Sequence, residues 1–150
     1  MGRNKKYEGY QAYQYLTPGI DYKAFKLREA IKKDWAYTVP LSQTEEEQVE
    51  EIIEKSILID LHEHPVLMSE DPRESASMSR EGREFMAYEA LSHSGLDAVF
   101  DNLMNGSAYI TSKHGWKWTD TIHDLGNRLC DIAQQNFVIH CKKAEDIITA

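Results

Sequence analysis

Cysteine is scarce in this sequence of 150 residues: only Cys130 and Cys141 are present. Two cysteines without Cys-x-x-Cys spacing are too few for a disulfide framework, so we expect buried, reduced thiols. Long apolar runs are absent too. No segment approaches the roughly 18 apolar residues of a membrane-spanning helix, and no apolar segment follows the charged start at residues 1–6, which argues against a signal peptide. These absences favour a soluble, cytoplasmic protein with no membrane partner.

The net charge of −8 is unevenly distributed. Residues 1–33 contain eight lysines and arginines against three acidic residues, whereas residues 43–101 contain sixteen acidic residues against four basic ones. The acidic middle disfavours nucleic acid as a partner, because phosphates attract positive charge. Residues 1–44, basic at their start and rich in tyrosine, are expected to form an N-terminal extension outside the core. This extension is either a solvated arm or a contact for an acidic partner.

A histidine pair follows the most apolar stretch of the chain. Residues 57–61 are apolar except for Asp60, which predicts a strand buried on both faces, as parallel sheets require. His62 and His64 end this strand. Because strand residues two apart share a face, both imidazoles can point at one position, and neutral imidazole is a zinc ligand. The alternative is a pair of incidental surface or core histidines.

The segments around this strand predict a βαβ unit. A capping box of Thr44 and Glu47 begins a helix over about residues 45–55, which should pack on the strand. After a polar loop at residues 66–79, a helix from Ser77 or Ser79 should extend to Ser92, and Gly95 is suited to a left-handed cap. A second, parallel strand follows at residues 96–100. Its end places Asp101 and Asn102 at the same sheet edge as the histidines, as site groups or as turn residues.

The remaining sequence alternates a long loop with helices. The loop at residues 105–118 contains His114 beside tryptophans, which either enclose a substrate or cover the end of the fold. A helix over residues 121–135 should bury the apolar stripe formed by Ile122, Leu125, Leu129, Ile132 and Ala133. His123 beside this stripe is expected to be structural.

Three segments carry a family resemblance. Ile59-Asp60-Leu61-His62-Glu63-His64-Pro65, the segment 95–100 and the segment 137–150 resemble the N-terminal part of the membrane (renal) dipeptidase-type zinc metallopeptidases of the amidohydrolase superfamily. The resemblance covers residues 45–150. It implies an α/β fold, a partial (β/α)₈ TIM barrel with its first two to three βα units, preceded by the extension at residues 1–44.

The resemblance also implies a chemistry. In this family two zinc ions at the barrel end activate a hydroxide that attacks a dipeptide carbonyl. His62 matches a metal-ligand histidine, and His64 stands at the position of a metal-ligand aspartate. The remaining ligands are expected beyond Ala150, so the chain alone should be inactive, and no catalytic residue is assigned within it. The implied partner is a small-molecule substrate, a dipeptide or related amide, and a homodimer is left open.

Two alternatives remain at this point. His-x-His is the pattern of the wider superfamily, which favours a different amidohydrolase of the TatD-like or deacetylase kind. The other alternative is a non-catalytic interaction module, in which the tyrosine-rich extension binds a partner.

Overall fold

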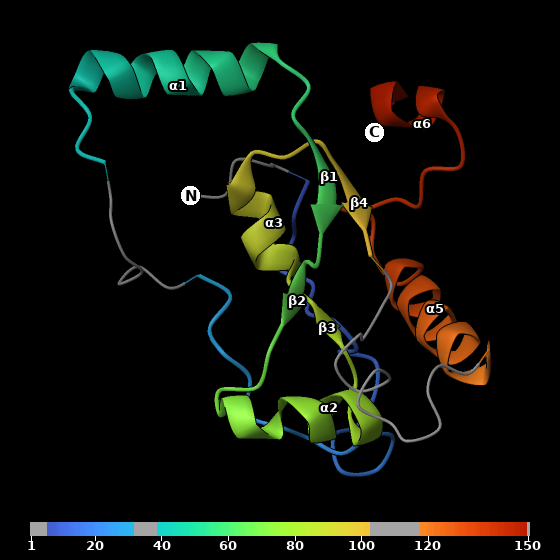
Figure 1. Ribbon diagram of the computed structural model, residues 1–150. Helices are drawn as coiled ribbons and strands as arrows, with labels where there is room; N and C mark the ends of the chain where they lie inside the picture. The colour runs from blue at the N-terminus through green and yellow to red at the C-terminus, as the bar shows by residue number, and fades with distance from the viewer. Residues whose placement is uncertain (1–5, 32–38, 103–117, 150) are drawn as a thin grey trace.

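The computed structural model describes residues 6–31, 39–102 and 118–149, and it is a mixed α/β fold with a small parallel sheet (Figure 1). The elements in chain order are α1 (Gln43–Lys55), β1 (Ile59–Glu63), β2 (Val66–Leu67), the 3₁₀ helix η1 (Pro72–Glu74), α2 (Ser75–Glu81), β3 (Phe85–Met86), α3 (Tyr88–Ser94), β4 (Ala98–Asp101), α5 (Trp118–Ile132) and α6 (Ala144–Thr149). The α/β class is confirmed at this level.

The predicted pair of parallel strands is confirmed. β1 and β4 pair in parallel, with Ile59 opposite Ala98 and an irregularity before the pairing of Glu63 with Asp101. Gly95 ends α3 in the left-handed conformation at φ 76°, as its position after a helix predicts. The carboxyl ends of the two strands therefore lie side by side.

The prediction that the first strand is buried on both faces is wrong. Ile59 is 44% exposed and Leu61 is 75% exposed, and Phe100 on β4 is exposed as well. The sheet contains only β1 and β4 in the described part of the chain, and no described helix covers the face that carries these side chains. The apolar run therefore forms a strand without the cover that a parallel sheet normally has.

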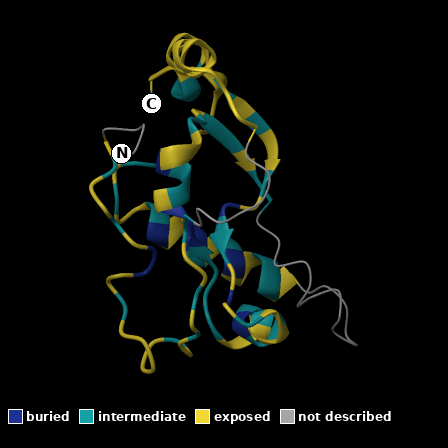
Figure 2. Cartoon of the chain, turned by 90° about the vertical axis from the view of Figure 1, so that its left-hand side faces the viewer, coloured by how far each residue is buried: buried dark blue, intermediate teal, exposed yellow. Residues whose placement is uncertain are grey.

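The helix α1 differs from its prediction in register and in packing. Its capping box is formed by Ser42 and Glu45, two residues before the predicted Thr44 and Glu47. None of its residues is buried, so it does not pack on β1 as expected. Figures 1 and 2 show α1 at the edge of the molecule, exposed along its length.

The segment between the strands is more divided than predicted. Instead of one loop and one long helix, it contains β2, η1 and two short helices, α2 and α3, with β3 pairing antiparallel to β2. The break lies at Gly82: its N–H makes the last helical bond, to the carbonyl oxygen of Met78, and its backbone then leaves the helical region at φ −100° and ψ −143°. The helix α2 therefore ends here and does not continue into α3.

The N-terminal arm, residues 6–31, contributes to the core. Ala12 and Tyr13 are buried together with Met86 and Tyr88 (Figure 2). The expectation that the first residues lie outside the core is therefore wrong for this segment. The boundary at residue 44 between an extension and a barrel portion stays a prediction. The arm contains no helix over residues 22–31, and its backbone runs antiparallel to residues 68–70 through the pairing of Leu27 with Ser69.

Two further expectations fail at the C-terminal end. Cys130 and Cys141 are free, but both are exposed, not buried. The helix α5 begins at Trp118, three residues before its predicted start, and the stripe residue Ile122 is 59% exposed. The buried positions of α5 are instead Asp124, Arg128 and Asp131, which form a charged face.

Candidate functional site

The two predicted ligands lie next to each other. The ring centroids of His62 and His64 are 5.2 Å apart and the ring planes meet at 80°. Both side chains are exposed, and they lie at and just after the carboxyl end of β1. The strand geometry that places residues two apart on one face thus brings the rings together.

The distance between the two ring centroids can be compared with the distance expected for two imidazoles bound to one zinc ion. Two imidazoles bonded to one tetrahedral zinc at about 2.0–2.1 Å have ring centroids roughly 5 Å apart. The pair fits two ligands of one ion, although an edge-to-face ring contact at roughly 4.5–7 Å would look similar. Within residues 6–31, 39–102 and 118–149, no group of three or more His, Cys, Asp or Glu side chains is arranged to hold a metal. These residues therefore supply two imidazoles and not a complete metal shell.

Asn102 joins the pair from the neighbouring strand. Its side-chain nitrogen lies 3.1 Å from both Nδ1 and Nε2 of His62. Its backbone N–H donates to the carbonyl oxygen of Glu63 at 3.0 Å, which fixes the end of β4 against the end of β1. The prediction that Asn102 shares a sheet edge with the histidines is confirmed.

A buried ionic cluster lies behind this edge. Arg128 on α5, whose side chain is only 3% exposed, donates to Asp101 at 2.8 Å and to Glu84 at 2.5 Å, and its Nε lies 4.0 Å from Asp124. One guanidinium thus faces three carboxylates. Asp101 connects the cluster to the histidine edge, because it pairs with Glu63 at the ends of the parallel strands.

Burial controls the ionisation of this cluster. It raises the pKa of the Asp124 carboxyl to about 6, with a smaller contribution from Glu84, and Arg128 opposes the rise. The pKa values of Glu84 and Asp101 are also raised by burial, while the charges of Arg128 and His64 lower them. His64 is therefore electrostatically coupled to the cluster.

The cluster is incompletely hydrogen-bonded. Asp101 Oδ1, Asp124 Oδ2 and Arg128 Nε are buried without a hydrogen-bond partner in the described part of the chain. Sequence reasoning missed the cluster because it assigned the apolar stripe of α5 to the core. The available signal was the spacing of Asp124, Arg128 and Asp131, which places three charges on one helix face.

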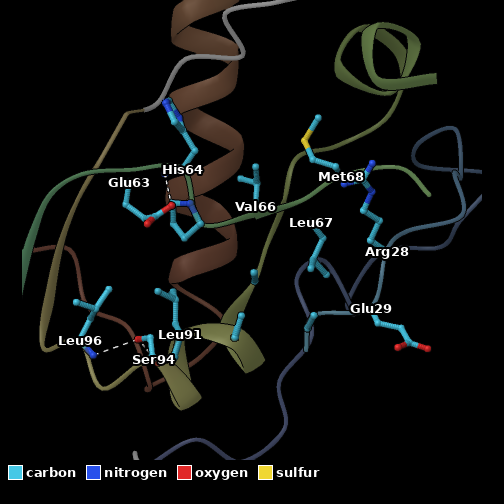
Figure 3. Close-up of a pocket in the computed structure, with 14 residues that line it drawn as sticks. Arg28, Glu29, Glu63, His64, Val66, Leu67, Met68, Leu91, Ser94 and Leu96 are labelled. Atoms are coloured by element: carbon cyan, nitrogen blue, oxygen red, sulfur yellow. Dashed lines mark hydrogen bonds between the residues drawn. The ribbon is translucent and has the colours of Figure 1, made fainter. Parts of the chain in front are cut away.

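A cavity of about 380 Å³ lies on another side of the histidine edge. Its walls come from the arm, β2 and α3, with mostly apolar side chains and the exposed Arg28. Figure 3 shows the imidazole of His64 pointing away from Val66, Leu67 and Leu91 in this wall. His64 is among the lining residues and His62 is not, so the cavity is not a pocket shared by the two rings.

Other residues considered from the sequence contribute little to this site. His114 and the neighbouring Trp116 lie outside the described residues, and Trp118 is an exposed residue at the start of α5. His123 is exposed on α5, where its Nδ1 lies 3.3 Å from the amide nitrogen of Asn127. His93 is exposed in the last turn of α3.

Comparison of the chain with known protein families, with curated proteins and with solved structures finds no significant match. The dipeptidase resemblance therefore depends on the short segments quoted above. Among the helices of the described residues, none is both long and apolar enough to cross a membrane.

Proposed function

We propose that this chain carries the first part of a zinc-dependent hydrolase barrel of the amidohydrolase type, acting on dipeptides or related amides, with His62 and His64 as metal ligands. The observation that supports this proposal is the approach of the two rings, 5.2 Å between centroids, beside Asn102 at the carboxyl end of two parallel strands. Barrel enzymes of this architecture hold their sites at that end of the strands.

The uncovered sheet supports a larger barrel. Ile59, Leu61 and Phe100 leave apolar surface exposed on the strand pair. Parallel sheets are normally covered on both faces, and complete burial of an apolar side chain is worth about 1.5–3 kcal/mol, of which these partly exposed side chains forgo a share. Further strands and helices of a (β/α)₈ barrel would supply that cover.

The residues present define their roles in the proposed chemistry. Bound zinc would polarise the amide carbonyl and activate water. His62 and His64 would hold the ion through one nitrogen each, and Asp101 would be kept in place behind them by its ion pair with Arg128. Among the described residues no third side chain joins the two histidines as a ligand group, and the proposal requires the rest of the shell to come from outside them.

Two amidohydrolase types are candidates, and they differ in the class of substrate that they hydrolyse. His64 offers an imidazole where the dipeptidase pattern has an aspartate, and this favours a TatD-like or deacetylase activity as the second candidate. A panel of dipeptides, N-acylated amino acids and nucleic acid, tested with the complete protein and added zinc, separates them. Hydrolysis of dipeptides supports the first assignment, and hydrolysis of another class supports the second.

The metal assignment is tested on the chain itself. Zinc bound after equilibrium dialysis is measured for the wild type, His62→Ala, His64→Ala and the control His93→Ala, which replaces an exposed histidine on α3. We expect each site variant to lose binding at the zinc concentration that loads the wild type and the control. Unchanged zinc binding by His62→Ala would refute the assignment. A wild type without zinc would favour a non-catalytic interaction module.

A further inference from the structure

His62 lies in an irregular part of β1. Before it, Asp60 pairs with Val99, and after it, Glu63 pairs with Asp101. β1 thus takes three residue steps where β4 takes two, and this one extra residue is the pattern of a β-bulge. Bulges next to functional sites change the direction of a side chain. The direction of the His62 ring therefore depends on how the bulge is closed.

The bulge is closed by one hydrogen bond on each side. On the near side, Oδ1 of Asp60 accepts the backbone N–H of His62 at 2.8 Å. On the far side, the backbone N–H of Asn102 donates to the carbonyl oxygen of Glu63 at 3.0 Å, one residue beyond His62. The first bond is local to β1, whereas the second depends on where β4 ends.

Arg128 holds the end of β4. Its Nη1 donates to Oδ2 of Asp101 at 2.8 Å, and its Nη2 donates to Oε2 of Glu84 at 2.5 Å. The helix α5 lies beside the end of β4 (Figure 1), and it is fixed to the core by the hydrogen bonds of Asp131, three residues after Arg128. Because hydrogen bonds between ionised groups are short and directional, this contact places Asp101, and with it Asn102, relative to the core.

We propose that Arg128, acting through Asp101, is a positioning residue for His62: by fixing the end of β4 it closes the bulge that directs this imidazole toward the metal. In the part of the chain that the structure describes, Arg128 bonds to carboxylates and to neither histidine. Its effect on the ring is therefore indirect. This inference rests on the proposed function, since the metal is what requires the two rings to converge.

The two histidines should depend on the end of β4 to different degrees. His64 is followed by Pro65, which is buried and whose carbonyl oxygen accepts the N–H of Ala87 at 2.7 Å. This bond ties His64 to the end of β3 by a route that does not include β4. Release of the end of β4 should therefore disturb His62 more than His64.

The test separates the hydrogen bond from the charge. Asp101→Leu removes the acceptor and a negative charge, whereas Asp101→Asn removes the charge and keeps an acceptor oxygen. Glu84→Met is the matched control, because it removes the other carboxylate bonded to Arg128, which lies outside β1 and β4. Both carboxylates interact with the charge of His64, so a pure charge effect on zinc would appear in all three variants.

Three measurements are needed. Titration with Zn²⁺ alone gives the affinity, and amide hydrogen exchange of Asn102 in the metal-free protein reports whether the bulge is closed. Circular dichroism checks that each variant is folded. We expect Asp101→Leu to weaken zinc binding about tenfold and to speed the exchange of the Asn102 amide, while Asp101→Asn and Glu84→Met change both much less. Equal weakening in Asp101→Leu and Asp101→Asn would show that charge alone acts and would overturn the inference.

Arg128→Lys keeps the test decisive if Asp101→Leu does not fold. It retains the positive charge but loses the planar fork that binds two carboxylates at once, so it should also weaken zinc binding and speed exchange at Asn102. A folded Arg128→Lys protein with wild-type affinity and exchange would overturn the inference. A wild type that binds no zinc would end the proposed function, and exchange at Asn102 would still decide whether Arg128 closes the bulge.

Discussion

The phenol of Tyr10 donates a 2.7 Å hydrogen bond to Oδ1 of Asp131, although 121 residues separate the two in the chain. The backbone N–H of Tyr13 donates to the same oxygen at 2.7 Å, and the phenol of Tyr88 donates to Oδ2 at 2.9 Å. One buried carboxylate on α5 thus receives three hydrogen bonds and holds the N-terminal arm on the core. Tyr13 adopts a left-handed backbone at φ 57°, which is costly for a residue other than glycine and is held here by this bond.

Replacing this carboxylate should destabilise the whole fold. Asp131→Ala leaves three donors without an acceptor, two of them buried, and we expect the free energy of unfolding to fall by about 3 kcal/mol. Asp131→Asn retains one acceptor oxygen and should cost roughly half as much. Urea denaturation measures both, with Glu145→Gln on the exposed face of α6 as a control. A loss in Asp131→Ala no larger than in the control would contradict the role of this residue.

The tyrosines around Asp131 should resist ionisation. Burial is the largest cause that raises the pKa of Tyr10, Tyr13 and Tyr88 above the ordinary value near 10, and the charge of Asp131 raises them further. Because their folded pKa values are raised, their stabilising contribution is present below pH 10 and is lost as the pH rises above it. Absorbance at 295 nm should show these phenols ionising only together with unfolding. Full ionisation of every tyrosine near pH 10 in a folded protein would refute this.

The buried arginine should be essential for stability at neutral pH. Arg128→Met leaves Glu84, Asp101 and Asp124 without their shared cation, and we expect a loss of about 3–5 kcal/mol at pH 7. The loss should be smaller at pH 4, where the carboxyls with raised pKa are protonated. Arg73→Met is the control, because Arg73 is 89% exposed and its pair with Asp71 should contribute less than about 1 kcal/mol. Equal losses in the two variants would exclude the cluster as a stabilising element.

The raised pKa of Asp124 predicts a specific pH dependence. Since the folded pKa of about 6 lies above the unfolded value near 4, this group stabilises the fold at low pH, and that contribution is lost as the pH rises from 4 to 6. Asp124→Asn removes the ionisable group. We expect the variant to match the wild type near pH 4 and to exceed its free energy of unfolding at pH 8 by on the order of 1 kcal/mol. Thermal unfolding at both pH values measures this, and a variant less stable than the wild type at pH 8 would show that Asp124 acts as a charged partner of Arg128.

The sequence predicted the parts of the fold that depend on local pattern. The strand before His62, the parallel second strand and the left-handed Gly95 all follow from apolar runs, strand alternation and the needs of a helix end. The position of Asn102 beside His62 follows from the rule that parallel strands end at one edge. These features need only neighbouring residues and one topological rule.

What the sequence did not show depends on contacts between distant residues. Asp131 receives its donors from residues 10, 13 and 88, and no local pattern relates them. The polarity of α5 was misjudged for a related reason: Arg128 is buried because Glu84 and Asp101, from other elements, surround it. An apolar stripe marks a helix, but the partners that fold against the helix decide which face becomes the interior.

The bond between Tyr10 and Asp131 has a consequence for the order of events during synthesis. The N-terminal arm leaves the ribosome long before α5. The carboxylate of Asp131, which accepts the hydrogen bond of Tyr10, is therefore not yet synthesised while most of the chain is being made. Ribosome-bound intermediates should therefore carry an undocked arm open to chaperones and proteases, and docking of the arm should be a late step that depends on translation through residue 131.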